Sequence, residues 1–257
     1  MMKRLFNGEI NSITVAALLV GGSSLISRLL GIFRDRILAG QFGAGDTLDI
    51  YYAAFRIPDL IFNLLVLGAL SAGFIPIFTG LIKEPVEKLR SLFSADHKEA
   101  WQLASSILNI LGFGLLVLCG LGVIFAPQIM RFITPGFSQE KMDLTVSLSR
   151  IMFLSPIFLG ISSVFGGILQ SFKRFFVYSM SPIFYNIGII IGALYFVPLW
   201  GIYGLAWGVV LGAAAHMAVQ IPALAQLGFK YKFKFDIYNS NVKKIWLMMI
   251  PRTMSLA

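Results

Sequence analysis

Apolar stretches long enough to cross a membrane recur along this sequence, and they limit its fold more than any other feature. A helix needs about 20 mostly apolar residues to span the ~30 Å hydrocarbon core. The stretches lie at about 13–38, 50–80, 101–127, 147–170, 178–198 and 202–227. A seventh begins near Ile245 and is too short to cross the membrane before Ala257. We therefore expect the chain to be the front part of a longer protein, or a fragment. The pattern predicts an all-α, polytopic helical membrane protein.

The composition agrees with a membrane location. Hydrophobic residues make up 57% of the chain and charged residues 13%, whereas a soluble domain carries roughly 25% charged residues. A transmembrane barrel needs short alternating strands, but the run 187–197 is continuously apolar. We expect an N-terminal six-helix transmembrane lobe at 1–227, a cytoplasmic or interfacial linker at 228–244, and the start of a seventh transmembrane helix at 245–257.

Lysine and arginine residues of the predicted loops fall mainly on one side of the membrane. On that side lie Lys3, Arg4, Lys83, Lys88, Arg90, Lys98, Lys173, Arg174, Lys230, Lys232, Lys234, Lys243 and Lys244. The opposite loops hold chiefly Arg131 and Lys141. Because cytoplasmic loops are enriched in Lys and Arg, we expect a multi-pass protein of the cytoplasmic membrane with its N-terminus inside the cell. This bias accounts for most of the net charge of +9 and requires no nucleic-acid partner.

Aromatic and basic residues alternate through 229–235 (Phe-Lys-Tyr-Lys-Phe-Lys-Phe). In a soluble protein this pattern also occurs on nucleic-acid-binding surfaces. Between two spans, aromatic rings settle at the level of the lipid headgroups while lysines reach anionic lipid. We therefore interpret the segment as a short strand or an interfacial linker in contact with membrane lipids.

Proline and glycine interrupt several of the predicted spans. Prolines occur at Pro58, Pro76, Pro156, Pro182 and Pro222. Such breaks are common in transporters, where cavity water or neighbouring helices satisfy the freed carbonyl groups. Glycines such as Gly188 and Gly192 also permit close helix packing. The pattern favours bent helices, although both residue types are enriched in membrane helices generally.

The first span contains charge where charge is costly. At 1.5 Å per residue from Ile13, Arg28 lies about 22 Å along the helix and Arg34 about 31 Å. A charged side chain near the bilayer centre costs about 2.5–3.5 kcal/mol on insertion scales, so it usually faces water, a counter-ion or a substrate. Arg28 is inside the membrane by this measure. Arg34 and Arg36 either reach the outer interface or face the same cavity.

The directions of these side chains follow from helix geometry. At 100° per residue, Arg28 and Asp35 share a face, whereas Arg34 points about 120° away from Arg28. A straight helix would not aim both arginines at one ligand, but a bend at Gly31 or a wide cavity would. Arginines in a cavity form a binding surface for a phosphate-bearing or polyanionic headgroup, because the guanidinium fork matches phosphate.

The second span supplies further charge. Arg56 and Asp59 are three residues apart and placed to neutralise each other. Asp49 either caps the helix start or pairs with an arginine of the first span. Asp46 and Asp49 also form an Asp-x-x-Asp pair, which holds Mg²⁺ and pyrophosphate in some prenyl-transferring membrane enzymes. A second acidic cluster, which such an enzyme needs, does not follow.

The remaining polar residues do not form a catalytic pattern. There is no Ser/His/Asp set, phosphate loop or metal-spaced His/Cys set, so we expect no metal, cofactor or catalytic residue. His216 is interpreted as a hydrogen-bonded intramembrane group, Asn186 and Gln220 as interhelical hydrogen-bond formers, and Cys119 as a small buried apolar residue.

The chain resembles the MurJ/MviN family of lipid II flippases, part of a superfamily of multidrug and polysaccharide exporters. The resemblance covers nearly the whole chain, and its most specific motif is the Ser-Arg-Leu-Leu-Gly-Ile-Phe-Arg-Asp stretch at 27–35. Other matching motifs are 42–45 with Asp49, 55–58, 68–71 to 74–76, 135–137, 167–170 with 174–175, Pro182 with 186–187, and 205–208 with 220–222.

The resemblance implies a fold of two six-helix lobes that form a V around a cationic cavity, of which this chain would be the first lobe. The family's cavity residues fall on Ser27, Arg28 and Arg34, and its acidic residue on Asp49; Asp35 and Arg56 are further candidates. This chain has 61–63 (Ile-Phe-Asn) where the family often has a basic pair, and Leu67 where the family often has Glu. We expect a less cationic cavity than is usual for the family.

The function implied is translocation of lipid II, a lipid-linked peptidoglycan precursor with an anionic polyprenyl-pyrophosphate group, by alternating access. Arg28 and Arg34 would hold the pyrophosphate or neighbouring anionic groups, and Asp49 would set their position. The alternatives are an exporter of polyprenyl-linked polysaccharide, a membrane enzyme acting on polyprenyl pyrophosphates, and a scaffold without transport activity. A cation exporter is disfavoured because it would need an acidic cavity.

Overall fold

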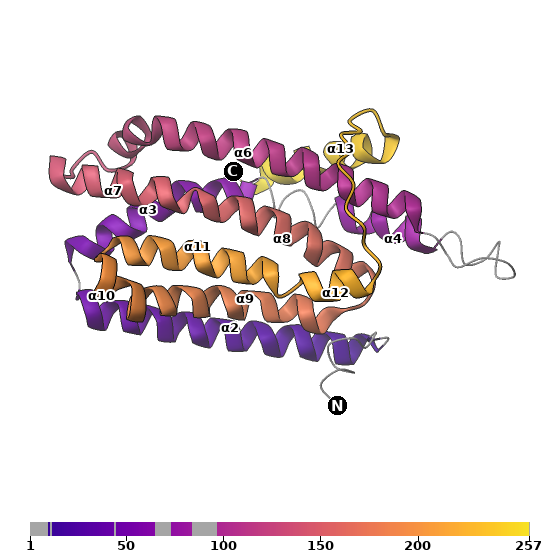
Figure 1. Cartoon of the computed structure of the whole chain (residues 1–257), viewed down its shortest axis with the longest axis horizontal. Helices are drawn as coiled ribbons and strands as arrows, with labels where there is room; N and C mark the ends of the chain where they lie inside the picture. The colour runs from indigo at the N-terminus through magenta and orange to yellow at the C-terminus, as the bar shows by residue number, and fades with distance from the viewer. Residues whose placement is uncertain (1–9, 11, 44, 65–72, 84–96, 257) are drawn as a thin grey trace, which may run out of the picture.

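The computed structural model describes residue 10 and residues 12–43, 45–64, 73–83 and 97–256, with 249–256 described by backbone only. The described part of the chain is a helical bundle, and most of its helices run nearly parallel or antiparallel to one another (Figure 1). The longer helices are α2 (Ile13–Phe42), α3 (Asp46–Phe62), α6 (Lys98–Ile133), α7 (Gln139–Met152), α8 (Leu154–Ser171), α9 (Phe175–Ile191), α11 (Tyr203–Ala218) and α13 (Ser240–Leu256). The shorter elements are α4 (Ile75–Lys83), the π-helical turn η3 (Gly192–Phe196), α10 (Val197–Trp200) and α12 (Ile221–Gln226).

The helices pack in an order that leaves α2 at the edge of the bundle. α2 lies against α9, α9 against α11, α11 against α8 and α8 against α6, while α3 packs on α7 (Figure 1). One apolar core joins α4, α6, α8 and α12 around Phe74, Phe78 and Leu115. A second joins α2, α3, α7, α9 and α11 around Leu38 and Leu205.

Glycine brings α9 and α11 into backbone contact. A Cβ atom placed on Gly188 would lie 2.3 Å from the Cα of Gly212, and one placed on Gly192 would lie 2.5 Å from the Cα of Gly208. No side chain fits at such distances, so the two helices meet through their small residues, as membrane helices often do. The interpretation of Gly188 and Gly192 as close-packing residues is confirmed.

Several helix breaks occur beside the prolines. The helix 139–171 is interrupted at Phe153, shortly before Pro156, and the helix 203–226 is interrupted at Val219 and Gln220, shortly before Pro222. Pro182, in contrast, lies inside the continuous helix α9. Proline therefore marks the breaks in two spans, whereas in α9, and likewise at Pro58 in α3 and Pro127 in α6, it lies inside a continuous helix.

Two helix starts differ from the sequence prediction. α7 begins at Gln139 rather than near 147 because the Ser138 hydroxyl accepts a hydrogen bond from the Lys141 N–H (3.4 Å) and caps the helix. α13 begins at Ser240, ahead of the apolar run at Ile245, with the Asn239 carboxamide accepting from the Asn241 N–H at 2.8 Å. In both cases a polar cap starts the helix before the apolar residues begin.

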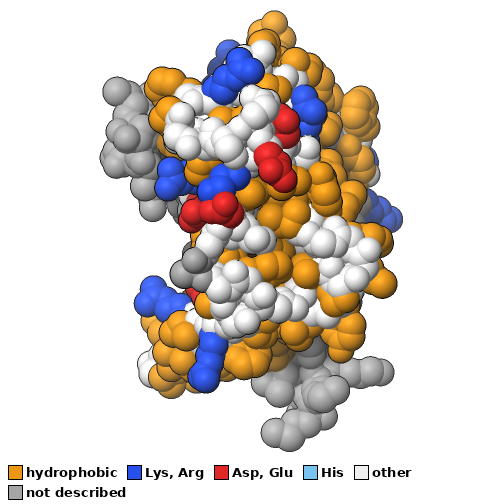
Figure 2. Space-filling view, turned by 90° about the vertical axis from the view of Figure 1, so that its left-hand side faces the viewer, with side chains coloured by type: hydrophobic (Ala, Val, Ile, Leu, Met, Phe, Trp, Pro, Cys, Tyr) orange, Lys and Arg blue, Asp and Glu red, His pale blue; other side chains and the backbone are white. Residues whose placement is uncertain are grey.

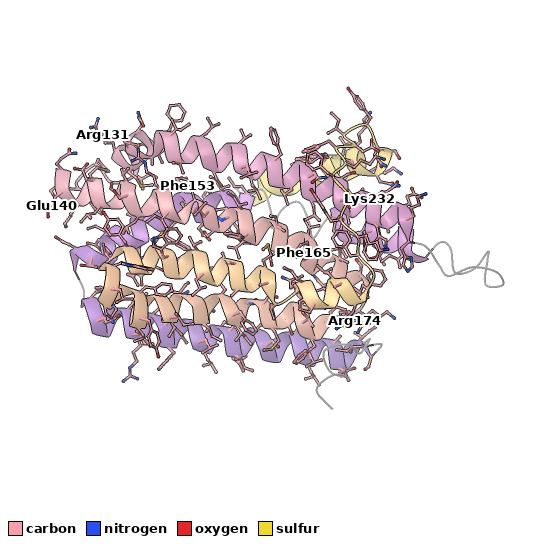
Figure 3. The ribbon with its side chains drawn as sticks, in the orientation of Figure 1. Arg131, Glu140, Phe153, Phe165, Arg174 and Lys232 are labelled. Carbon is pink, nitrogen blue, oxygen red and sulfur yellow. The ribbon has the colours of Figure 1, made fainter. Side chains whose placement is uncertain are left out.

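Five described helical stretches are long and apolar enough to cross a membrane: Ile13–Phe42, Lys98–Ile133, Gln139–Ser171, Phe175–Trp200 and Tyr203–Gln226. The predicted second span corresponds to α3 and α4, and its middle, 65–72, lies outside the described residues. Arg131 and Glu140 lie at one end of the bundle, and Arg174 and Lys232 lie at the other (Figure 3). The chain has the fold of a polytopic helical membrane protein.

Candidate functional site

α2 exposes most of its surface, and Arg28 lies on the exposed side. The helix buries only Ser23 and Leu38. Leu25, Leu29 and Ile32, which neighbour Arg28 on the helix surface, are also exposed. Among the described residues Arg28 has no hydrogen-bond or ion-pair partner. A guanidinium in the middle of a membrane-length helix requires water or an anion outside the part of the chain that the structure describes.

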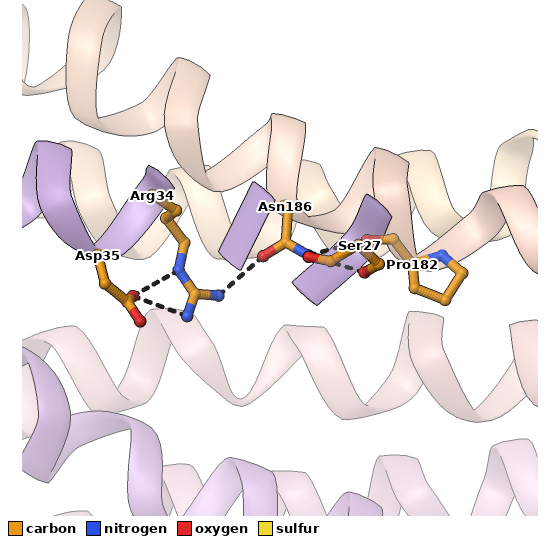
Figure 4. A network of polar contacts seen from close by, with 5 residues as sticks. All are labelled: Ser27, Arg34, Asp35, Pro182 and Asn186. Atoms are coloured by element: carbon orange, nitrogen blue, oxygen red, sulfur yellow. Dashed lines mark hydrogen bonds and ion pairs between the residues drawn. The ribbon is translucent and has the colours of Figure 1, made fainter. Parts of the chain in front are cut away.

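Arg34 lies in a polar network between α2 and α9 (Figure 4). Its Nε and Nη2 atoms contact the Oδ1 of Asp35 at 2.9 and 2.8 Å, and its Nη1 donates to the Oδ1 of Asn186 at 3.0 Å. The Asn186 Nδ2 donates in turn to the hydroxyl of Ser27 (3.2 Å) and to the carbonyl oxygens of Ser27 (3.3 Å) and Pro182 (3.1 Å). The network brings together three of the predicted site residues and adds Asn186.

This network fixes Arg34 without saturating it. The Arg34 side chain is 24% exposed, and these contacts use three of the five N–H groups of a guanidinium. The other two N–H groups have no partner among the described residues and are available to a ligand. Asp35 supplies a counter-charge. The carboxamide of Asn186 orients the Arg34 guanidinium without neutralising its charge, because the carboxamide is itself neutral.

The geometry of α2 is that of one uninterrupted helix. There is no break at Gly31, and a Cβ there would lie 3.8 Å from the Asn186 Oδ1, an ordinary contact. Arg34 therefore turns towards α9, while Arg28 faces away from the bundle. A bend that aims both arginines at one ligand is absent from α2, so a shared ligand would have to occupy a wide cavity.

A polar groove with a volume of about 550 Å³ lies between α3 and the α6–α7 connection. Its charged lining residues are Asp49, Arg56 and Lys141, and Tyr52 and Phe137 contribute aromatic walls. Figure 2 looks onto this end of the bundle, where acidic and basic side chains gather close together. The Lys141 ammonium pairs with Asp46 and lies over the Phe137 ring, so it ties the start of α7 to the start of α3.

Asp49 and Arg56 are placed differently from the expected pairings. The N-cap of α3 is Gly45, and no ion pair among the described residues joins Asp49 to an arginine of α2. Asp49 lies in the first turn of α3, where its negative charge interacts favourably with the positive end of the helix dipole. The predicted Arg56–Asp59 pair is wrong: the Asn63 amide donates to Asp59 at 2.9 Å instead, and Arg56 faces the groove.

The network and the groove are neighbours. Both Arg34 and Asp35 interact electrostatically with Tyr52 on α3, and Tyr52 lines the groove. Buried Tyr51, next to it, interacts with the same two charges. The predicted site residues thus form two adjoining polar areas, with Arg28 outside both.

The other intramembrane polar groups form structural contacts. The Ser162 hydroxyl lies 2.6 Å from the Nδ1 of His216, and the amide of Gln220 donates to the same hydroxyl. This confirms His216 as a hydrogen-bonded group and Gln220 and Asn186 as interhelical hydrogen-bond formers. Cys119 is buried, as expected. Within the described ranges, no cluster of His, Cys, Asp or Glu has the composition of a metal site.

Two residues of the site were not predicted from the sequence. Lys141 had counted only towards loop charge, and its pairing with Asp46 occupies one carboxylate of the Asp-x-x-Asp pair. Asn186 was expected to bond between helices, but its partner Arg34 lies 152 residues away in the sequence. A signal for Asn186 does exist, because a carboxamide in a long apolar helix requires a polar partner.

Comparisons with known proteins agree with one another. The family model described as lipid II flippase MurJ matches residues 38–257. A probable lipid II flippase MurJ from Rhizobium tropici is 30% identical over 90% of this chain and 43% of its own length. The lipid II flippase MurJ of Burkholderia cenocepacia is 27% identical over 94% of this chain and 46% of its own.

A solved structure has the same fold. It is described as lipid II flippase MurJ in an inward closed conformation, and it aligns with a TM-score of 0.70 and 25% identity over 93% of this chain and 48% of its own. This chain thus spans about half the length of the proteins that it matches. The chain belongs to the MurJ family of lipid II flippases.

Proposed function

We propose that the chain forms the substrate-binding half of a flippase that moves lipid II across the cytoplasmic membrane by alternating access. The observation that carries the proposal is the Arg34 network: a guanidinium on a membrane-length helix, held by Asn186 and Asp35, with two N–H groups that have no partner among the described residues. Membership of the MurJ family supports lipid II as the substrate. The activity requires no covalent chemistry from the chain.

In this mechanism the two arginines bind the anionic headgroup from different sides. Arg34 presents its fork from the wall formed by α2 and α9, and Arg28 binds from the exposed face of α2, where its charge has no partner among the described residues. Bidentate contacts between guanidinium and phosphate are strong and directional. The pyrophosphate would thereby replace the water that Arg28 otherwise needs.

A second lobe would complete the cavity. The matched relatives are about twice as long as this chain, and the exposed face of α2 supports a second lobe opposite it. Asp49, Arg56 and Lys141 would receive the headgroup at the outer end of the path, because their groove adjoins the Arg34 network through Tyr52. The lysine-rich end would face the cytoplasm.

Growth of a flippase-depleted bacterium tests the proposal. We expect Arg28→Ala and Arg34→Ala each to abolish complementation, with lipid II translocation reduced about 10–100-fold because a charge-assisted contact is lost. Arg131→Ala is the matched control, since Arg131 is exposed at the end of α6, away from the network. Membrane levels are measured by immunoblot. Normal growth of both α2 variants at normal protein levels would refute the proposal.

A further inference from the structure

The segment between α12 and α13 separates two cavities of opposite character. It crosses α8 and α6 without forming a helix (Figure 1). Its aromatic residues Phe229, Tyr231, Phe233 and Phe235 line one cavity, and Lys230 and Lys232 line the other. In an extended chain, successive side chains point to opposite sides. The aromatic and basic alternation in the sequence thus becomes two distinct surfaces.

Side chains of α6 hold this segment in place. The Asn109 amide donates to the carbonyl oxygens of Lys232 (3.3 Å) and Lys234 (2.9 Å), and the Tyr231 hydroxyl donates back to Asn109. The Lys232 N–H donates to the Ser105 hydroxyl at 3.2 Å. Two polar side chains of α6, Ser105 and Asn109, therefore fix the register that directs Lys230 and Lys232 to one side.

The cavity on the aromatic side is an apolar groove of about 550 Å³ between α6, α8 and the segment. Gly112 lines it, and a Cβ placed there would meet nothing within 4 Å. Phe165 of α8 forms part of the opposite wall (Figure 3). The groove is shaped for hydrocarbon.

The cavity on the basic side measures about 370 Å³ and is cationic. Lys98, Lys230 and Lys232 line it together with Trp101 and Gln102, and none of the described residues of its lining is a carboxylate. Along α6, Gln102 of this pocket lies about 9 Å from Leu108 of the apolar groove. The charged pocket and the apolar groove therefore follow one another along α6, as the headgroup and the acyl chain follow one another in a lipid.

We propose that this pair of cavities is a binding site for an anionic phospholipid of the surrounding leaflet, such as phosphatidylglycerol. The three lysines would bind its phosphate, Trp101 would lie at headgroup level, and one acyl chain would occupy the groove above Gly112. Charge complementarity selects an anionic over a zwitterionic headgroup, and the groove selects a lipid over a soluble phosphate. The site is separate from the Arg34 network and does not depend on the flippase activity.

Native mass spectrometry of the purified protein in detergent tests this site. The protein is mixed with equal amounts of phosphatidylglycerol and phosphatidylcholine that carry the same acyl chains. We expect phosphatidylglycerol to be retained about tenfold over phosphatidylcholine. The preference should vanish in the triple variant Lys98→Gln, Lys230→Gln, Lys232→Gln. The control triple variant Lys234→Gln, Lys243→Gln, Lys244→Gln removes equal charge from the same end and should keep the preference.

A second arm tests the groove and the source of the phosphate. Gly112→Leu fills the groove and should reduce retention of both lipids, whereas Gly120→Leu, also in open space on α6 but outside the groove, should not. Millimolar glycerol phosphate should fail to displace the lipid. Equal retention of the two lipids, equal effects of the two triple variants, or displacement by glycerol phosphate would each overturn the proposal. Helicity by circular dichroism verifies that every variant is folded.

Discussion

Arg28 and Arg34 lie on one helix but meet opposite conditions. Arg34 is held by a carboxylate and a carboxamide, whereas Arg28 has no partner among the described residues. An arginine that is already oriented loses less entropy when it binds an anion. We therefore expect Arg34 to determine the orientation of the bound headgroup. Arg28 should contribute electrostatic attraction to the headgroup, which depends less on exact position.

In the proposed site Asn186 acts through Arg34, with which it is hydrogen-bonded, and this role can be tested separately. Asn186→Leu removes the acceptor for Arg34 and the donors to Ser27, so we expect lipid II translocation to fall about tenfold. Because the residue acts by positioning Arg34, the Arg34→Ala and Asn186→Leu double variant should be no worse than Arg34→Ala alone. Additive losses in the translocation assay would contradict a shared role.

At the scale of elements, the contact between α9 and α11 depends on glycine. Gly208→Leu would drive a side chain into Gly192, whose Cα lies 2.7 Å from the position of the added Cβ. We expect a loss of about 3 kcal/mol in the free energy of unfolding, as for other overpacked sites. Gly120→Leu on α6 meets open space and should change stability by less than about 0.5 kcal/mol. Denaturant titration in detergent measures both, and equal effects would contradict the packing.

The elements that the sequence predicted well are the ones that apolar length defines. The stretches predicted at 13–38, 101–127 and 178–198 correspond in the structure to α2, α6 and the helical stretch 175–200. The start of α7 was missed because Gln139, Glu140 and Lys141 look like a polar loop, whereas the Ser138 cap makes them helical. Hydropathy measures transfer into lipid and does not register a local hydrogen bond at a helix end.

The site was harder to predict than the helices because its contacts are long-range. Helix periodicity correctly separated the directions of Arg28 and Arg34, since that depends only on position along one helix. The partner of Arg34 depends on how α9 packs against α2. The Arg56–Asp59 pairing failed because Arg56 turns to the groove, while the Asn63 amide donates to Asp59. Spacing within a helix allows a pair without requiring it.

At the scale of the whole molecule, the two ends of the bundle carry different surfaces. The connection between α6 and α7 lies at the end with the polar groove, and the segment before α13 lies at the end with the lysine pocket (Figures 1 and 3). The proposed alternating access needs a defined inside and outside, so under this proposal the orientation determines which end receives the substrate. The Lys and Arg distribution predicts that the lysine pocket is inside.

Cysteine accessibility tests this orientation directly. Phe132 is 88% exposed and Tyr238 is 80% exposed, at opposite ends of the bundle, while the native Cys119 is buried and is replaced by alanine to remove background. We expect a membrane-impermeant maleimide added to spheroplasts to label Phe132→Cys at once and Tyr238→Cys only after permeabilisation. The reverse pattern would invert the predicted topology, and it would move the entry side for lipid II to the groove lined by Asp49, Arg56 and Lys141.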